Sequence, residues 1–318
     1  MKNTGISPDM KALSEYIARA TPASVPAPVQ ARAKIHLIDS FAAMVAGSQL
    51  LPGQRATTYV RALGGEPQAT VIGTGLRVPT QYAALANGMC AHANETDDTH
   101  PPTRTHPGSS VVPAALAIAE HHGLPGRDFL RAMILGYDVC ARVMLTLAPQ
   151  YVSSSFGHLF GAASASAALL QLNAKQVRHV LTYAGQQASG LYTRLRDPLH
   201  VEKAFAVGGM GARNGVECAL MVQHGFSGVD DVYSGQHNFL ATHSSKGSIK
   251  PLACGLGRDY EILRGGIKCW SAGGPIQGPL HVLNEMMQRH GLVANQVKQV
   301  IAHLPEKELA LVTHREAS

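Results

Sequence analysis

The stretch Gly161–Leu170, GAASASAALL, consists almost entirely of small residues until its final leucines. Side chains this small let neighbouring helices approach closely, which favours a densely packed helical domain. Working outward, apolar residues recur three and four positions apart through most of the first 225 residues, with Pro or Gly between the segments. The pattern predicts helices at Pro28–Gly47, Thr80–Asn94, Val111–His122, Asp128–Leu147, Leu159–Leu172, Ala174–Ser189 and Ala212–His224, and a short strand or hairpin at Ala69–Val78.

The sequence changes character after Gly225. It becomes rich in turn-forming residues and then predicts a strand at Tyr260–Ile267, a helix at Pro275–His290 and a strand at Val297–Leu304. The expected fold is therefore mainly α, with a large all-helical domain over residues 1–258 and the start of a smaller α+β lid domain over residues 259–318. Because so short a β-α-β stretch has few neighbours to cover it, we expect the lid to be truncated.

The composition is that of a globular protein. The chain has 318 residues, of which 45% are hydrophobic and 15% charged, which is enough for a large core and argues against disorder. No apolar run reaches the roughly 18 residues of a membrane span, and the N-terminal stretch has no continuous apolar segment behind its first lysine. Five scattered cysteines form no C-x-x-C pair. We therefore expect a cytoplasmic protein with reduced thiols and no membrane partner.

The charge balance favours anionic partners. The chain has 27 Lys and Arg against 21 Asp and Glu, a formal charge of +6, and 16 histidines besides. Nucleic acid is disfavoured because the basic residues do not cluster into runs and only 5% of residues are aromatic. A small di- or tricarboxylate fits better, since a few cations converging in one pocket are enough to bind it.

The densest group of polar residues is HANETDDTHPPTRTH, His92–His106. Its prolines exclude a helix through the middle, so the segment is expected to be a loop between two helices, where functional groups are often displayed. Three interpretations remain open: a solvated acidic loop, a metal site built from imidazoles and carboxylates, and metal-free acid–base chemistry in which carboxylates orient an imidazole. The spacing matches no zinc signature, so we expect neither a metal nor a cofactor.

Two lysines and a histidine stand out elsewhere. Lys203 precedes a glycine cluster, Gly208–Gly211. We expect this cluster to form a turn that opens a helix at about Ala212 and presents backbone N–H groups to an anion. The alternative is that these glycines allow tight helix packing. Lys268 lies before a Gly-Gly-Pro helix start, which suits a carboxylate ligand, although a surface lysine is the alternative. His158 follows a Ser-rich turn and is either a satisfied core residue or a pocket group.

Four segments together resemble successive landmarks of the MmgE/PrpD family, and their order and spacing agree with it. They are NGMCAHANETDDTHPPTRTHPGSSVVPAALAIAE, SSSFGHLFGAASASAALLQL, EKAFAVGGMGARNGVECALMVQHGFSG and GIKCWSAGGPIQGPL. The resemblance extends from about Lys11 over nearly the whole chain. It implies a helical domain plus an α+β lid, a homodimer, an active site in the cleft between domains, and metal-free chemistry on small polycarboxylates, as in 2-methylcitrate dehydratase, cis-aconitate decarboxylase and iminodisuccinate epimerase.

The resemblance also implies site residues. The acidic residue of the family's H-x-x-[DE]-x-D-D-T loop corresponds to Glu95, the following pair to Asp97 and Asp98, and the His-Pro histidine to His106. The lysine of the Gly-rich motif corresponds to Lys203 and that of the interdomain segment to Lys268.

This chain departs from the family pattern in three ways. Val152 stands where two branches have a histidine, with His158 as the only nearby substitute, and Gln277 stands where the interdomain motif has another. Family members are also longer, at about 450 residues, so a truncated chain, a split reading frame or a degenerate gene are open alternatives.

The resulting hypothesis is a hydro-lyase-like enzyme that abstracts a proton α to a carboxylate of a small polycarboxylate. His106 is the expected proton-transfer group, with Glu95 or Asp98 in support, and Lys203 and Lys268 are expected to hold carboxylates and stabilise the developing charge. His158, Asp97 and Gln277 complete the expected substrate-binding set. The alternative is a non-catalytic relative that binds anions or only dimerises. If the protein is an enzyme, the alternative activities are epimerisation and decarboxylation.

Overall fold

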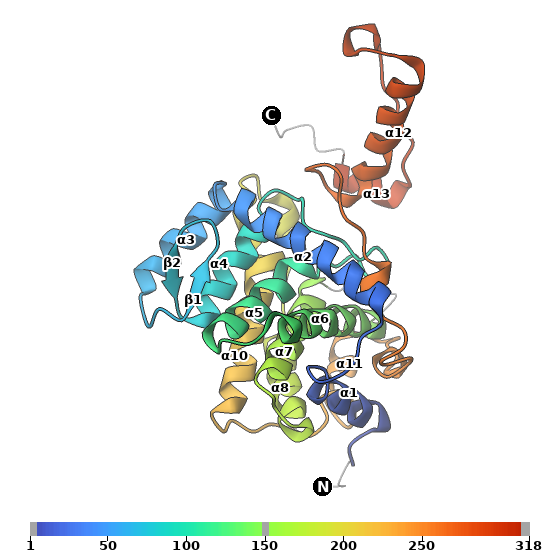
Figure 1. Cartoon of the computed structure of the whole chain (residues 1–318). Coiled ribbons are helices and arrows are strands. Elements are labelled where there is room, and N and C mark those ends of the chain that lie inside the picture. Colours follow the sequence, from blue (N-terminus) through green and yellow to red (C-terminus); the bar gives the residue numbers. More distant parts are fainter. Residues whose placement is uncertain (1–4, 148–152, 313–318) are drawn as a thin grey trace. The chain divides into compact units, whose positions relative to one another are not determined.

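A computed structural model describes residues 5–147 and 153–312 of the chain (Figure 1). The chain divides into two compact units, Met1–Ile267 and Lys268–Ser318. The domain boundary expected after residue 258 falls inside the first of these units. A mainly α fold is confirmed, because helices dominate and the described residues contain a single two-stranded sheet.

The first unit contains the longer helices. Its elements are α1 (Pro8–Ala18), α2 (Ala27–Gly47), α3 (Leu51–Leu63), β1 (Ala69–Val71), β2 (Leu76–Val78), α4 (Thr80–His92), α5 (Gly108–His121), α6 (Gly126–Leu147), α7 (Ser155–Leu169), α8 (Ala174–Gln187), α9 (Val201–Ala204), α10 (Met210–Gln223) and α11 (Phe239–His243), with the short helical turns η1 (Tyr192–Arg196), η2 (Phe205–Gly209), η3 (Lys250–Leu252) and η4 (Glu261–Arg264). All seven helices expected in this region form, with ends shifted by a few residues, whereas α1, α3 and the short helices α9 and α11 were not predicted.

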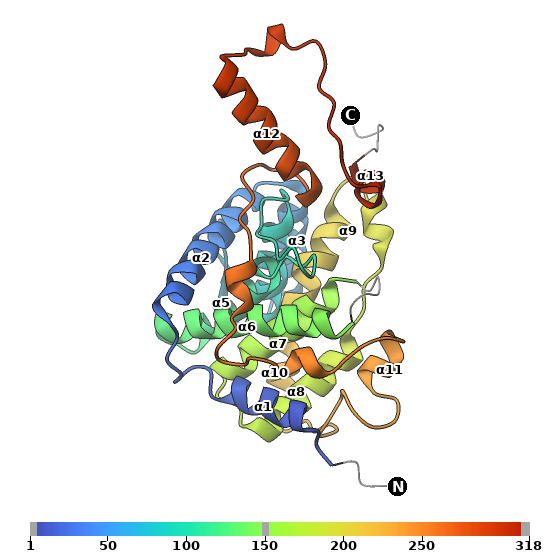
Figure 2. The same ribbon diagram turned by 90° about the vertical axis from the view of Figure 1, so that its right-hand side faces the viewer.

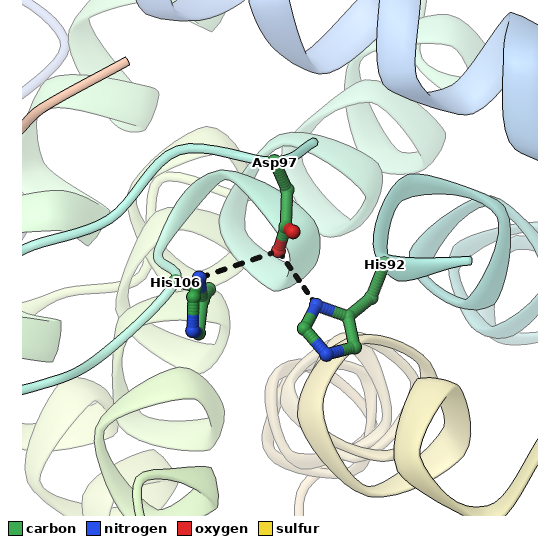
Figure 3. A group of neighbouring side chains, drawn as sticks. All are labelled: His92, Asp97 and His106. Carbon is green, nitrogen blue, oxygen red and sulfur yellow. Dashed lines mark hydrogen bonds and ion pairs between the residues drawn. The ribbon is translucent and has the colours of Figure 1, made fainter. Parts of the chain in front are cut away.

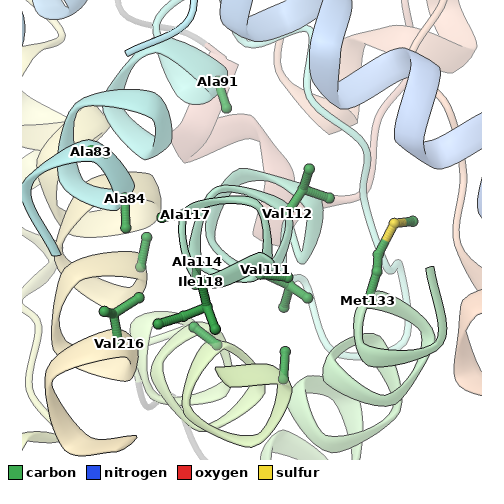
Figure 4. Packing of buried hydrophobic residues seen from close by; sticks show 14 of the residues in the cluster. Ala83, Ala84, Ala91, Val111, Val112, Ala114, Ala117, Ile118, Met133 and Val216 are labelled. Atoms are coloured by element: carbon green, nitrogen blue, oxygen red, sulfur yellow. The ribbon is translucent and has the colours of Figure 1, made fainter. Parts of the chain in front are cut away.

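Helix α5 lies at the centre of the larger core cluster. Its residues from Gly108 to Ala119 are buried except Leu116, and side chains of α4, α6 and α10 surround it (Figure 4). A second cluster joins α1 to α6, α7 and α8, and both views show α1 beside α8 (Figures 1 and 2). Because α5 is apolar on every face, its position at the centre of a helix layer follows from its sequence.

The small residues of α7 bring it very close to its neighbours. A Cβ atom added at Gly161 would lie 2.6 Å from the carbonyl oxygen of Gly136 on α6, and one added at Gly215 on α10 would lie 2.5 Å from Ala162 Cβ. Neither approach leaves room for a side chain. The dense packing predicted from this stretch is therefore confirmed.

The glycine cluster after Lys203 does not form a turn, so that expectation is wrong. The chain is continuously helical from Val201 through α9, the π-helical segment η2 and α10. A Cβ atom at Gly208 would lie 2.0 Å from the carbonyl oxygen of Gly88 on α4, so this glycine allows η2 to pack directly on α4. The alternative of tight helix packing is the one that the structure supports.

The predicted hairpin is confirmed, and the two predicted strands near the C-terminus are wrong. In the hairpin, Ala69 pairs with Val78 and Val71 with Leu76 in antiparallel register. Residues 260–267 instead contain η4, because Glu261 donates its N–H to the buried Asp138, and of these residues only Gly266 forms a β-bridge, with Thr99. Residues 297–304 likewise lack strand structure, and Val300 and Ile301 are exposed.

The second unit contains α12 (Gly274–His290), η5 (Ala294–Gln296) and α13 (Glu306–Val312). Helix α12 confirms the helix predicted at Pro275–His290, and Gly291 ends it in the left-handed conformation at φ 61°. Among residues 5–147 and 153–312, no helix combines the length and the apolar character needed to cross a bilayer.

A buried carboxylate fixes the segment that leads out of the first unit. Asp138 on α6 accepts hydrogen bonds from Tyr16 Oη at 2.9 Å and from the Glu261 N–H at 2.6 Å. The neighbouring Arg142 donates to the carbonyl oxygens of Pro251, Cys254 and Asp259. Burial raises the pKa of Asp138 to about 6, against the opposing influence of Arg142.

The raised pKa of Asp138 predicts that the protein loses stability as the pH rises. An unfolded aspartate has a pKa of about 3.9, so between pH 4 and 6 the folded state keeps a proton that the unfolded state loses, and stability falls as the pH rises through this window. Asp138→Asn removes this loss. The free energy of unfolding of the variant relative to the wild type should therefore rise by up to about 3 kcal/mol from pH 4 to pH 7. Urea denaturation at four pH values measures it.

Asp128→Asn, at the N-terminal end of the same helix, is the matched control. Its free energy of unfolding relative to the wild type should change far less between pH 4 and pH 7. A difference between Asp138→Asn and wild type that stays constant with pH would contradict the inference.

Candidate active site

The loop between α4 and α5 carries the candidate site. His92 is the last residue of α4, and the backbone then turns through Glu95, which has a positive φ of 53°. A non-glycine residue in this conformation is uncommon, and such residues cluster at functional sites. The loop predicted from the prolines is therefore present.

Asp97 joins two imidazoles. Its Oδ2 atom lies 2.8 Å from His92 Nδ1 and 3.7 Å from His106 Nδ1 (Figure 3). Figure 3 shows that both rings turn the same nitrogen toward the carboxylate and point Nε2 away from it. Because Asp97 is 1% exposed, His92 0% and His106 19%, the carboxylate and the His92 ring are buried and His106 lies at the accessible edge.

Two further contacts orient His106. Its Nδ1–H donates to the main-chain oxygen of Asp98 at 2.8 Å, which makes Nε2 the basic nitrogen of the neutral ring. Its main-chain N–H donates to His158 Nε2, also at 2.8 Å. His158 is fully buried, and among the described residues its Nδ1 has no hydrogen-bond partner. The structure therefore places His158 behind His106, where it contacts the His106 backbone.

Asp98 points the opposite way from Asp97, into the core. Its Oδ2 lies 2.6 Å from His36 Nδ1 on α2 and accepts the Tyr137 hydroxyl of α6 at 2.6 Å, while Oδ1 accepts the Gly108 N–H of α5 at 3.0 Å. The side chain is fully buried. Asp98 therefore supports His106 through its main chain, and its carboxylate joins three helices.

Lys203, Glu95 and His200 form the other accessible part of the site. Lys203 Nζ donates to Glu95 Oε1, and His200 Nε2 lies 3.8 Å from the same oxygen. His200 also bonds the main-chain oxygen of His92 at 3.0 Å and stacks on the His92 ring, with centroids 5.4 Å apart. The side chains are 18% (Glu95), 24% (Lys203) and 25% (His200) exposed, so a solute can reach them.

Burial controls the charge of the inner imidazoles. It lowers the pKa of His92 to about 3, although Asp97 acts in the opposite direction. It also holds the pKa of His158 well below its usual range, with His106 adding to the effect. Both inner rings are therefore neutral near pH 7, and the remaining imidazoles, His106 and His200, lie at the accessible edge.

Two predicted substrate-binding residues belong to the second unit. Lys268 is its first residue. The Gln277 amide is engaged within that unit, because its oxygen accepts the N–H groups of Cys269 and Trp270 and its nitrogen donates to the carbonyl oxygens of Trp270 and Ala272. Gln277 therefore fixes the turn before α12. Val152, which replaces a family histidine, lies outside the described residues.

The first unit thus brings together five of the residues named from the sequence: Glu95, Asp97, His106, His158 and Lys203. Sequence reasoning missed His200, which has a positive φ of 59° and precedes α9. It also missed His36 and Tyr137, the partners of Asp98. The one available signal was the position of His200 three residues before Lys203, which places both at the start of one helix.

Within residues 5–147 and 153–312, two groups of side chains have the types and spacing of metal ligands. His92, Asp97 and His106 form one, and His92, Glu95 and His200 form the other, with ligand atoms within 4.8 Å of one another in each. Acid–base chemistry at His106 needs no metal, and the Lys203 ammonium provides a cation for an anionic ligand.

The class of protein that the structure defines is a helical domain in which imidazoles and carboxylates of the α4–α5 loop lie beside a lysine of α9. A model of the MmgE/PrpD N-terminal domain matches residues 11–252. The match covers most of the chain, which therefore belongs to the MmgE/PrpD family, as its motifs indicated.

Curated relatives agree with this assignment. The chain is similar to a cis-aconitate decarboxylase-like protein, oryM, of Aspergillus oryzae, at 28% identity over 300 residues, which is 87% of this chain and 61% of the relative. It is also 28% identical to the cis-aconitate decarboxylase of Homo sapiens over 235 residues, 68% of this chain and 47% of the human protein. The chain spans about half to three fifths of the length of these relatives.

The three contacts of Asp98 predict a large loss of stability when its charge is removed. Asp98→Asn keeps one acceptor but sets an NH2 group against a donor, and a buried network left partly unsatisfied costs about 2 to 4 kcal/mol. Thermal and urea unfolding measure this change. Asp230→Asn, whose half-exposed carboxylate pairs with Arg178, is the control and should cost less than about 1 kcal/mol. Equal effects of the two variants would contradict the structural role of Asp98.

Proposed function

We propose that this protein is a metal-independent lyase that acts on small di- or tricarboxylates by abstracting a proton α to a carboxylate and expelling a β-substituent such as water. The observation that carries the proposal is the orientation of His106, whose Nδ1–H is held by a main-chain oxygen while its ring lies at the accessible edge of the cluster. Membership of the MmgE/PrpD family and the named cis-aconitate decarboxylases among its relatives support the substrate class.

His106 acts as the base in this proposal. Nε2 takes the α-proton, and the electron pair of the broken C–H bond delocalises into the adjacent carboxylate as enolate-like charge. Asp97, 3.7 Å from Nδ1, stabilises the imidazolium that forms. Collapse of the enolate-like species forms the double bond and breaks the bond to the β-hydroxyl group, which leaves as water with a proton returned by the imidazolium.

Lys203 holds the substrate carboxylate in the same proposal. Its ammonium group pairs with Glu95 in the structure, and both side chains are partly exposed. A substrate carboxylate at this lysine forms a charge-assisted hydrogen bond and shares in stabilising the enolate-like charge. Glu95 then positions Lys203, and His200 lies close enough to take part in binding.

We keep Lys268 as a proposed second carboxylate-binding residue, and a homodimer in the cytoplasm as the proposed state and location of the protein. Lys268 supplies a charge for a second carboxylate of the substrate, as the family resemblance implies. Gln277 contributes through the turn that it fixes around Cys269 to Ala272. Asp98 and His158 contribute by positioning His106.

Decarboxylation of the same class of acids is the second candidate, because the relatives bear that name. It shares the need to stabilise carbanion-like charge beside a carboxylate, but the bond that breaks joins two carbons and releases CO2. Product analysis on a panel of citrate-like acids and their unsaturated counterparts distinguishes the two reactions. A non-catalytic anion-binding protein would convert none of them.

The role of His106 predicts that His106→Ala abolishes turnover and the exchange of the substrate α-proton with deuterated solvent, and leaves the helical fold intact. The His106 ring is partly exposed, so its loss removes little packing. Proton exchange by NMR and circular dichroism measure the two properties. Near-normal turnover by a folded His106→Ala preparation would remove this residue from the mechanism.

The role of Lys203 predicts that Lys203→Met weakens the binding of dicarboxylates about ten- to a hundredfold, because a charge-assisted hydrogen bond contributes about 1.5 to 3 kcal/mol. Calorimetry with succinate and citrate measures the affinity. Lys175→Met, at the start of α8, is the matched control and should bind these anions normally. Unchanged affinity in Lys203→Met would exclude Lys203 as a substrate ligand.

A further inference from the structure

His92, Glu95 and His200 gather around one point at the accessible edge of the cluster, with ligand atoms within 4.8 Å of one another. We propose that these three residues form a binding site for a borderline divalent cation such as Zn2+, and that a bound cation separates Lys203 from Glu95. Imidazole nitrogen and carboxylate oxygen are ligands that Zn2+ accepts, and three protein ligands leave a fourth position for water. The cation is an inhibitor of the site, not a requirement of its chemistry.

The orientation of His92 is the first argument. Asp97 accepts the Nδ1–H of His92 at 2.8 Å, which is how a carboxylate orients a metal-binding histidine from behind. Nε2 then carries the lone pair and points away from Asp97 (Figure 3). Among the described residues this buried nitrogen has no hydrogen-bond partner, and a buried polar atom without a partner costs free energy that a ligand would recover.

The position of Glu95 and His200 is the second argument. His200 Nε2 and Glu95 Oε1 are 3.8 Å apart, and both residues are held in the left-handed region, at φ 59° and 53°. His200 Nε2 donates to the main-chain oxygen of His92 at 3.0 Å, so a metal at this nitrogen replaces that hydrogen bond and the ring proton moves to Nδ1. In a tetrahedral zinc site with bonds of about 2.0 to 2.2 Å, ligand atoms lie roughly 3.4 Å apart. The group needs a contraction of up to about 1.4 Å, which the partly exposed His200 and Glu95 side chains can supply. These two side chains also give the ion a route from solvent.

The other candidate group, His92 with Asp97 and His106, fits less well. A metal on Asp97 Oδ2 would have to replace its hydrogen bond to His92 Nδ1, and it would remove the carboxylate that orients both rings. Binding at His92 Nε2 retains this hydrogen bond and breaks only the one from the partly exposed His200 ring to the His92 main-chain oxygen. The structure therefore favours the group that contains His200.

Lys203 gives the proposal its regulatory consequence. Its ammonium group donates to Glu95 Oε1, the same oxygen that lies nearest His200. A divalent cation and an ammonium group repel each other and compete for this carboxylate, so metal binding displaces Lys203. If Lys203 holds the substrate carboxylate, as the proposed function requires, metal and substrate binding oppose each other. Only this inhibitory consequence rests on the proposed function.

The test is a titration of the substrate-free chain with Zn2+ by calorimetry, and with Co2+ by the visible absorption of a four-coordinate site. Substrate is left out because polycarboxylates themselves chelate metals. We expect one site, weakened at least tenfold in His200→Asn and in Glu95→Gln. Asparagine is chosen at position 200 because it tolerates a positive φ. If His200→Asn fails to fold, Glu95→Gln tests the proposal in its place. Lys203→Met should bind Zn2+ at least fivefold more tightly, since the competing charge is gone.

His121→Gln is the matched control and should bind Zn2+ as the wild type does. His121 and His122 are an exposed pair with ring centroids 4.7 Å apart, so they are the alternative place on the surface where Zn2+ could bind. Loss of binding in His121→Gln, unchanged binding in both His200→Asn and Glu95→Gln, or weaker binding in Lys203→Met would overturn the proposal. Failure of the proposed function would instead appear as absent turnover and unchanged anion affinity in Lys203→Met, with the metal titration unaffected.

Discussion

The carboxylate of Asp98 is the interaction on which the site depends. It lies fully buried and bonds His36 of α2, Tyr137 of α6 and the first N–H of α5. A buried carboxylate with three hydrogen bonds is strongly held, whereas the same group with one bond missing would destabilise the fold. Because the carboxylate has its partners only when the three helices are in place, folding of the domain and ordering of the loop are one event.

The residues on both sides of Asp98 in the loop are also held by hydrogen bonds. Asp97 must face the other way, which carries it to His92 and His106. Thr99 exchanges two main-chain hydrogen bonds with Gly266, and His100 Nε2 lies 3.1 Å from Glu261 Oε2. The segment that ends the first unit is thus attached to the loop that carries the candidate site. A short set of hydrogen bonds therefore links residues 261–266 to the loop that carries His106.

Local patterns in the sequence predicted the parts of the fold that depend on local physics. Helical periodicity located the helices to within a few residues, and the prolines after His100 located the loop. The strand predicted at Tyr260–Ile267 failed because contacts distant in the sequence hold its backbone: the Glu261 N–H donates to Asp138, 123 positions away, and Gly266 bridges to Thr99. The site divides in the same way. Motif spacing identified Glu95, Asp97 and His106, which lie on one loop. It missed His36, which is 62 positions from its partner Asp98, and His200, which is 108 positions from its partner His92.

Burial separates the site into a fixed half and an adjustable half. His92, Asp97 and His158 are buried, and two of them are imidazoles that burial keeps neutral. Glu95, Lys203, His106 and His200 lie at the accessible edge, where carboxylate, ammonium and imidazole groups face one another. The inner half can therefore orient a proton-transfer group without changing its own charge, while the outer half exchanges partners. The Glu95–Lys203 pair places one carboxylate and one ammonium group at this edge, so the same ion pair offers a partner to an anion and a partner to a cation.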